Sequence, residues 1–448
     1  MDRFYQYVEA NADRFVGELM DLARQPSIAA QGIGLRETAE MVRARLERLG
    51  ASARLIEVEG GAPVVFGELG DRGPTLMIYN HYDVQPPEPL HLWTTPAFEP
   101  TIRDGKLYAR GVADNKGNTM ARLQAVEAWL ATQGELPVRL RWVVEGEEEI
   151  GSVHLEDFVE ANAGLLRGAD GCLWEAGSRD VAERPMLTCG LKGIMYVELR
   201  VRGAARDLHS STATIVPNPA WRLVWALSTL KDDQDRITID GYLDHVAPPP
   251  PEAVEVAKQI PFDEAALKQS YGIDQFINGA SGFDAVYKNL FMPTCTICGL
   301  DSGYTGEGSK TVLPSRAMAK VDLRLVPNLQ PDLALRLLRE HLDRRGFTDI
   351  EMVDLGGEPP ARSPVDSKVA LAARRAAEIV YQQPPVVYPN MAGSGPQYYL
   401  CDHLGIPAVS SGCGYSGSNV HAPDENIRLA DYLDHIRFMG EFIRAFGA

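Results

Sequence analysis

Three apolar stretches of this chain run straight into histidine or acidic residues, and this arrangement constrains the fold more than any other feature. Residues 75–81 form a strand candidate that ends in a histidine, and residues 138–144 continue directly into the run Glu-Gly-Glu-Glu-Glu at 145–149. A third short stretch, 171–174, is followed at once by Glu175. Open α/β sheets place their ligand sites at the carboxyl ends of strands. The pattern predicts an α/β fold with a functional site at one edge of the sheet.

The length of the chain indicates more than one hydrophobic core. Its 448 residues exceed the roughly 250–300 residues at which single cores stop growing. Beyond residue 185 two β-α-β patterns follow one another, and a Gly- and Pro-rich segment then leads back to helices. We therefore expect a discontinuous α/β domain made of residues 1–185 and 359–448, interrupted by an inserted domain of residues 186–358.

The amino-acid composition argues against several classes of binding partner and cellular location. The net charge of −17 argues against nucleic acid or an anionic membrane as the main partner. No stretch approaches the ~20 apolar residues of a membrane span, and the charged N-terminus lacks the apolar run of a signal peptide. Six scattered cysteines form no disulfide framework. These features predict a cytoplasmic protein.

Two segments near the first strand carry residues suited to a metal site. In a strand, positions 81 and 83 face the same side, so Asp83 can hold the imidazole of His81 by a hydrogen bond and raise its basicity as a ligand. Asp114 lies among glycine and asparagine residues just before a helix. It is either an N-cap or a carboxylate that presents one oxygen to each of two metal ions.

The glutamate run and a late histidine add to this set. Consecutive glutamates usually mark a solvated helix face, but Glu148 and Glu149 follow directly on an apolar strand and should be drawn into a pocket. One can then coordinate a metal while the other takes a proton from water. His421, in a Gly/Ser loop, becomes a ligand only in company with the others. Two imidazoles and several carboxylates suit a pair of zinc ions, which predicts a di-metal hydrolase.

Five motifs, HYD, GVADNKG, EGEEEIGS, LWEAG and SNVHAPDE, occur in this order along nearly the whole chain. Their succession resembles the di-zinc aminopeptidase and deacylase family of acetylornithine deacetylase, succinyl-diaminopimelate desuccinylase, aminoacylase and the cytosolic dipeptidases related to carnosinase. The resemblance implies a zinc-peptidase-like catalytic domain with a mixed sheet flanked by helices. It also implies that the inserted α+β domain serves as a lid and dimerisation domain.

The resemblance assigns roles around the two zinc ions. Asp114 is implied to bridge the ions, and the peptide bond that follows it is expected to be cis. Glu148 matches the general base, and Asp83 matches the acid that orients the first histidine. The implied metal ligands are His81, Asp114 and Glu175 for one ion, and Asp114, Glu149 and His421 for the other.

One ligand remains open between two residues. Dipeptidases of the carnosinase type often carry aspartate where this chain has Glu175, whereas deacylases more often carry glutamate. Asp170 lies five residues before Glu175 and is a competing ligand.

The inserted domain also carries residues that the resemblance makes functional. His209, in Asp-Leu-His-Ser, matches a histidine that crosses into the partner's active site in dimeric relatives and stabilises the oxyanion there. Arg324 matches an arginine that binds the carboxylate of the substrate, and a guanidinium can do so as a bidentate pair. Ser394 and Gly395 belong to a loop that resembles one closing on the substrate backbone. A homodimer formed through the lid domain is therefore expected.

These residues together predict metal-assisted amide hydrolysis of dipeptides or small peptides with two Zn²⁺ ions per subunit. The same ligand types also suit Mn²⁺ or Co²⁺. The alternative is a deacylase of N-acyl amino acids, such as N-acetyl or N-succinyl substrates, with the same chemistry. A non-catalytic relative would typically have lost ligands or the base, and this chain retains all of them.

Overall fold

The computed structural model covers residues 1–448 and divides into two compact units. Unit 1 comprises Met1–Gly190, Arg362–Pro389 and Pro396–Ala448, and unit 2 comprises Leu191–Ala361 and Asn390–Gly395. The chain passes from one unit to the other at β10 (Gly190–Leu191), at β17 (Ala361–Arg362) and at both ends of Asn390–Gly395. The α/β fold class is confirmed, with a central mixed sheet flanked by helices.

Segment Asn390–Gly395 was expected in the first domain but belongs to unit 2. The backbone N–H of Lys192 donates to the carbonyls of Met391 (3.2 Å) and Gly393 (2.9 Å). The Asn390 side chain donates to the carbonyl of Leu290 at 2.9 Å. These bonds join the segment to residues far away in the sequence. No local sequence pattern predicts such contacts.

The sheet of unit 1 has eight strands in the order β1-β2-β6-β3-β7-β19-β9-β18. The three neighbours β6, β3 and β7 run parallel, whereas β1, β2 and β6 pair antiparallel. The carboxyl ends of β6, β3 and β7 therefore lie at the same edge of the sheet. The strands are β1 (Ser52–Ile56), β2 (Val64–Leu69), β3 (Thr75–His81), β6 (Arg139–Glu145), β7 (Gly171–Trp174), β9 (Met186–Thr188), β18 (Val386–Tyr388) and β19 (Ala408–Ser410).

Helices cover both faces of this sheet, as the complete burial of β3 requires. Alternate residues of β3 join different cores, Leu76 and Ile78 on one face and Met77 and Tyr79 on the other. The first core is completed by α1 (Asp2–Ala10), α2 (Ala12–Arg24), α3 (Leu35–Arg48), α4 (Gly117–Gln133), α11 (Lys368–Tyr381) and α13 (Leu429–Phe446), and the second by α5 (Leu155–Leu166) and α12 (Gln397–Leu400).

Small sheets order the loops of unit 1. They are β4 (Thr101–Arg103) with β5 (Lys106–Tyr108) and β21 (Asn426–Arg428), and β8 (Ser178–Arg179) with β20 (Gly414–Tyr415). Because β21 pairs with β5, the loop that precedes β21 is brought beside the segment that leads from β5 into α4.

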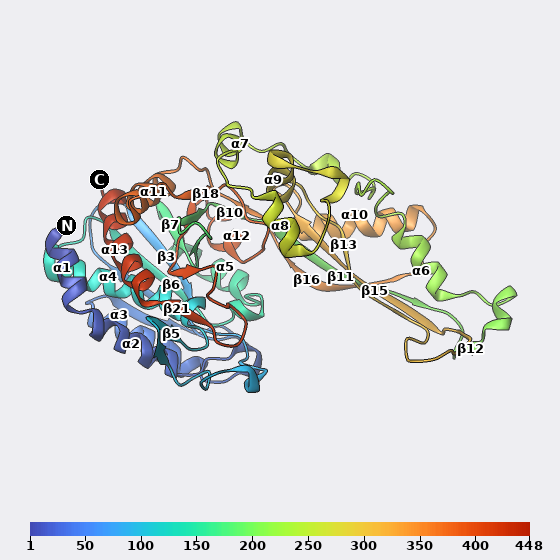
Figure 1. Ribbon diagram of the computed structural model, residues 1–448, viewed down its shortest axis with the longest axis horizontal. Coiled ribbons are helices and arrows are strands. Elements are labelled where there is room, and N and C mark those ends of the chain that lie inside the picture. The colour runs from blue at the N-terminus through green and yellow to red at the C-terminus, as the bar shows by residue number, and fades with distance from the viewer. The chain divides into compact units, whose positions relative to one another are not determined.

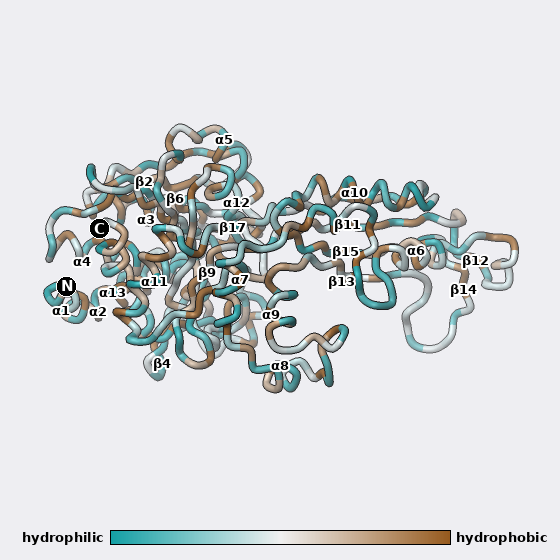
Figure 2. The backbone as a smooth tube through the Cα atoms, turned by 90° about the horizontal axis from the view of Figure 1, so that it is seen from above, coloured by the Kyte–Doolittle hydropathy of each residue, from teal (hydrophilic) through white to brown (hydrophobic).

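Unit 2 is built on a four-stranded antiparallel sheet in the order β13-β15-β11-β16. β11 and β15 pair over ten residues each, and alternate residues of both face a core closed by α6 and α10. In Figure 2 hydrophobic and hydrophilic residues alternate along α10, as expected for a helix with one buried face. The remaining elements are β11 (Gly193–Arg202), β12 (Leu208–His209), β13 (Thr296–Ser302), β14 (Val312–Leu313), β15 (Arg316–Leu325), β16 (Glu351–Glu358), α6 (Pro219–Leu227), α7 (Pro251–Ala257), α8 (Glu264–Tyr271), α9 (Gly282–Phe291) and α10 (Pro331–Arg344).

None of the helices has both the length and the apolar character needed to cross a membrane.

Candidate metal centre

A cluster of histidines and carboxylates gathers at the carboxyl edge of the unit 1 sheet. β3 ends on His81, whose register partner Glu145 ends β6. The chain after β6 turns into a short 3-10 helix that carries Glu148 and Glu149, and Glu175 follows β7 directly. The parallel arrangement of three neighbouring strands thus brings together residues that are up to about a hundred positions apart in the sequence.

His81 is completely buried and lies at the centre of the first half of the cluster. Its Nε2 atom is 3.0 Å from Asp114 Oδ1, 3.1 Å from Glu175 Oε2 and 3.9 Å from Glu148 Oε2. Its Nδ1 atom faces Asp83, at 3.1 Å from the carbonyl oxygen and 3.3 Å from Oδ1. The ring therefore presents Nε2 to the carboxylates while Asp83 holds the opposite nitrogen.

His421 forms the second half of the cluster. Its Nε2 atom is 3.2 Å from Asp114 Oδ2 and 3.0 Å from Glu149 Oε2. Asp114 thus directs one carboxylate oxygen to each imidazole, and the N-cap alternative for this residue is wrong because α4 begins at Gly117 with no side-chain cap. The peptide bond between Asp114 and Asn115 is cis, as the resemblance implies.

The donor atoms lie close enough together to hold a metal ion. Two groups of side chains, His81 with Asp114 and Glu149, and His81 with Glu148 and Glu175, each place their ligand atoms within 4.8 Å of one another. Glu175 Oε2 is buried; it faces His81 Nε2 at 3.1 Å but accepts no hydrogen bond. Such an oxygen is costly to bury unless an ion or a donor satisfies it.

The pKa values of the clustered side chains also favour bound cations. Burial raises the pKa of the Glu175 carboxyl to about 8, with a further contribution from Asp114. Burial and the neighbouring Glu175 raise the pKa of Glu148 well above its ordinary value. Hydrogen bonds to Asp114 and Glu149 raise the pKa of His421 to about 10. Negative charge is therefore in surplus here, and bound cations would neutralise it.

The two candidates for the open ligand lie at opposite ends of β7. Asp170 precedes the strand, and its Oδ2 accepts a hydrogen bond from the backbone N–H of Thr75 at 2.7 Å, where β3 begins. Glu175 follows the strand and lies beside His81, where β3 ends. Of the two, the structure brings only Glu175 into the cluster.

Asp83 also organises the glutamate turn. Its two carboxylate oxygens accept the backbone N–H groups of Glu148 (3.3 Å) and Glu149 (3.0 Å). The neighbouring Glu147 points elsewhere, since its carboxylate accepts from the Ala62 N–H and contacts His154. Only two of the consecutive glutamates therefore enter the cluster.

Glu425 supports the cluster but is not among the residues predicted from the sequence. Its carboxylate is buried, forms an ion pair with Arg110 at 2.7 Å, and accepts the backbone N–H groups of Gly111 (2.8 Å), Ala113 (2.9 Å) and Asp114 (3.1 Å). It fixes the backbone that carries the central carboxylate. The only signal in the sequence is its place four residues after His421.

The predicted residues of unit 2 fall into two groups. Arg324 donates from Nη1 to Ser394 Oγ at 2.8 Å, and its Nε lies 3.3 Å from Asp322; Gly395 ends the same segment. His209 lies on β12 and is exposed, with its Nδ1 2.9 Å from Ser211 Oγ. Arg324 and Ser394 are thus brought together, whereas His209 lies apart from them in unit 2.

Comparison with known proteins identifies the family to which this chain belongs. Residues 77–445 match the model of peptidase family M20/M25/M40. The chain belongs to this peptidase family. Among curated proteins, it is 30% identical to the Beta-Ala-His dipeptidase of Homo sapiens over 475 residues, covering 99% of this chain and 92% of the relative. It is also 30% identical to the Cys-Gly metallodipeptidase dug1 of Schizosaccharomyces pombe over 362 residues, covering 77% of this chain and 76% of that protein.

Solved structures share the fold. An M20 family metallo-carboxypeptidase from Sulfolobus solfataricus, Sso-CP2, superimposes with a TM-score of 0.90 at 41% identity, covering 97% of this chain and 99% of that one. Human carnosine dipeptidase 1 superimposes with a TM-score of 0.77 at 27% identity, covering 100% and 99%. Family and relatives together identify the chain as a metal-dependent peptidase.

Proposed function

We propose that this chain is a dipeptidase that uses two divalent cations to cleave the amide bond of dipeptides or small peptides. Zinc is the first candidate for these cations. The observation that carries the proposal is the Asp114 carboxylate, which directs one oxygen to His81 at 3.0 Å and the other to His421 at 3.2 Å. A carboxylate shared in this way suits a pair of ions about 3.5–4 Å apart. The relatives named for dipeptides support the substrate class.

Each ion would have its own ligands and share one. His81 and Glu175 would hold the first ion, Glu149 and His421 the second, and Asp114 both. When bound, the ions would lower the pKa of a water molecule into the neutral range and polarise the scissile carbonyl. Nitrogen and oxygen ligands suit Zn²⁺ and also Mn²⁺ or Co²⁺.

Glu148 would act as the general base. Its carboxylate reaches the edge of the cluster, with Oε2 3.9 Å from His81 Nε2, and its backbone is held by Asp83. From this place it would take a proton from the attacking water and return it to the leaving amine. Asp83 would also orient His81 through the nitrogen that faces away from the carboxylates.

Unit 2 would supply recognition of the substrate. Arg324 keeps N–H donors beyond those that face Ser394 and Asp322, so it can bind the carboxylate at the end of a peptide. Ser394 and Gly395 would contact the substrate backbone. His209 would stabilise the oxyanion of the tetrahedral intermediate in the partner subunit.

Two other activities use the same chemistry on different substrates. A carboxypeptidase, favoured by the 41% identical metallo-carboxypeptidase, would remove one residue from longer peptides. A deacylase would cleave N-acyl amino acids. All six cysteines are free, which suits a reducing, cytoplasmic compartment.

The test is a panel of substrates offered to zinc-reconstituted protein: dipeptides, tripeptides, N-acetyl amino acids and N-succinyl amino acids. We expect kcat/KM for the best dipeptide to exceed that for the best N-acyl amino acid at least about tenfold, a difference of ~1.4 kcal/mol in transition-state binding. Release of the C-terminal residue from tripeptides at an equal rate would indicate the carboxypeptidase instead. Cleavage of N-acyl substrates alone would indicate the deacylase.

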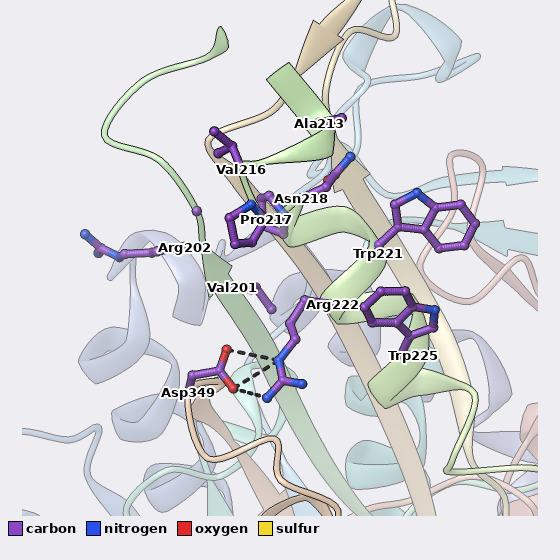
Figure 3. A pocket seen from close by; sticks show the side chains of 12 residues that line it. Val201, Arg202, Ala213, Val216, Pro217, Asn218, Trp221, Arg222, Trp225 and Asp349 are labelled. Carbon is purple, nitrogen blue, oxygen red and sulfur yellow. Dashed lines mark hydrogen bonds and ion pairs between the residues drawn. The ribbon is translucent and has the colours of Figure 1, made fainter. Parts of the chain in front are cut away.

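We further propose that the protein is a homodimer formed through unit 2. Helix α6 exposes Trp221 and Trp225, each more than half exposed, with ring centroids 5.9 Å apart. Figure 3 shows both tryptophans lining a pocket, together with Arg222, which binds Asp349. The volume of this pocket is about 510 Å³. Such aromatic surface is enriched at interfaces and unusual on a monomer.

An edge strand of the same unit adds to this surface. β13 is the outer strand of its sheet and exposes Ile297 and Leu300, 51% and 60% accessible. An exposed apolar edge is a template for pairing with another chain. A second copy of this chain, which brings the same helix face and the same edge, is the partner that a symmetric interface requires.

Variants of α6 and His209 test the dimer and the shared site. The double variant Trp221→Ala/Trp225→Glu is expected to sediment as a monomer, since it removes both aromatic side chains and adds a charge. His209→Ala should lose activity as a homodimer while it still binds metal. Mixed with Glu148→Gln, it should recover about one quarter of normal activity, because about half of randomly mixed dimers are hybrids with one complete site.

An equally mixed preparation that stays inactive would argue against His209 acting across the dimer. The matched control for the double variant of Trp221 and Trp225 is Trp129→Ala, which removes a tryptophan buried in unit 1. It should lower stability without changing the sedimentation of the folded protein.

A further inference from the structure

We propose that Arg122 is the residue that positions the ligands of the first cation, an inference that rests on the two-metal function proposed above. Arg122 lies on α4, and its side chain is completely buried. Its Nη1 donates to the Tyr79 carbonyl (2.8 Å) and to Asn80 Oδ1 (3.0 Å). Its Nη2 donates to the carbonyls of Trp174 (2.6 Å) and Ser411 (2.9 Å).

Two of these acceptors lie directly beside residues of the cluster. Asn80 precedes His81 at the end of β3, and Trp174 precedes Glu175 at the end of β7. A single guanidinium therefore holds the ends of two neighbouring strands at the points where each delivers a ligand.

The third ligand is reached through one more hydrogen bond. The Asn80 side chain, which accepts from Arg122, donates through its amide to Asn115 Oδ1. Asn115 follows Asp114 in the sequence. The chain Arg122 to Asn80 to Asn115 thus extends the same positioning contact to the carboxylate shared by both ions.

Burying the charged guanidinium of Arg122 costs free energy. This cost indicates that the geometry of its hydrogen bonds is what matters. Other buried arginines of unit 1 have carboxylate partners: Arg45 binds Glu18 at 2.8 Å and Glu127 at 2.6 Å. Arg122 forms no ion pair; its hydrogen-bond acceptors are carbonyl and amide oxygens, and the charge of Glu175 acts on it only at longer range. A buried charge without a counter-ion is expensive, and an apolar side chain of similar size often stabilises a core better. Burial lowers the pKa of Arg122 to about 10, so it remains charged at neutral pH.

Lysine at this position would keep the charge and lose the geometry. An ammonium is a point charge on a flexible stem, whereas the planar guanidinium reaches acceptors on several segments at fixed angles. Loss of residues that support metal ligands typically weakens metal affinity about 10–100-fold. We expect Arg122→Lys to weaken the binding of one Zn²⁺ ion by this factor and to change the other less.

Isothermal titration of the metal-free protein with Zn²⁺ measures this directly, with circular dichroism and thermal melting as checks of folding. Arg45→Lys is the matched control, because it alters a buried arginine of the same unit that touches no residue of the cluster; it should lower the melting temperature and leave both affinities unchanged. Asn80→Ala removes the bond to Asn115 and one of the four acceptors of Arg122. It should weaken binding in the same direction by a smaller factor, so the inference stays testable if Arg122→Lys does not fold.

The outcomes separate this inference from the function on which it rests. Two bound ions in the wild type, with a selective loss of affinity in Arg122→Lys or Asn80→Ala, would support both. Two ions bound with unchanged affinity in the folded variants would overturn the role of Arg122 and leave the two-metal function standing. A wild type that binds no ion would overturn both.

Discussion

Glu148→Gln is expected to retain both cations and to lose about 10²–10⁴-fold in kcat. Glutamine has nearly the same shape as glutamate, and the backbone N–H that binds Asp83 is unchanged, so the turn should keep its conformation. The amide cannot accept a proton from water, and the reaction would lose its base. Metal content by mass spectrometry and initial rates on a dipeptide measure the two effects separately.

The neighbouring Glu147→Gln is the matched control. Glu147 lies in the same turn but binds the Ala62 N–H and His154 rather than the cluster. It should show near-normal kcat and metal content. If Glu148→Gln hydrolysed dipeptides as fast as this control, Glu148 would not be the base.

Asp114→Asn is expected to abolish hydrolysis by removing the carboxylate that, on the proposed function, both ions would share. An asparagine side chain offers one oxygen and an NH₂ group that repels a cation, so it cannot face His81 and His421 as the two carboxylate oxygens do. Affinity for metal should fall by more than the roughly 10–100-fold that loss of a supporting residue costs. Zinc content after dialysis against a weak chelator measures the loss.

Asp170→Asn provides the comparison for this variant. Asp170 lies at the amino ends of β3 and β7, where it accepts from the Thr75 N–H, and an asparagine oxygen can keep that bond. Full zinc content and normal rates are expected. Loss of metal in Asp170→Asn, with retention in a Glu175→Gln variant, would reverse the choice between the two candidate ligands.

Much of the cluster could be predicted from the sequence because local pattern and sheet geometry agree there. When neighbouring strands run parallel, as β6, β3 and β7 do, the functional residues that end them lie at the same edge of the sheet. The sequence predicts the positions of His81, Glu148 and Glu175 in this way. The motif order added Asp114 and His421, whose segments are loops without a periodic pattern.

The supporting contacts could not be predicted because they join segments that no local pattern relates. Arg122 lies within an apolar helical stretch and reads as an ordinary helix residue, yet it bonds to residues 43 and 289 positions away. Glu425 reaches back 311 positions to the N–H of Asp114. Ser394 joins unit 2 through Arg324 and the neighbouring backbone bonds, although the surrounding sequence belongs to unit 1.

The most direct test of the central claim is to titrate metal-free protein with Zn²⁺ while the hydrolysis of a dipeptide is followed. The two-ion site predicts negligible turnover without metal and a rate that reaches its plateau at two equivalents of Zn²⁺ per chain. Full activity in the metal-free protein, or a plateau at one equivalent with no second ion bound, would contradict it.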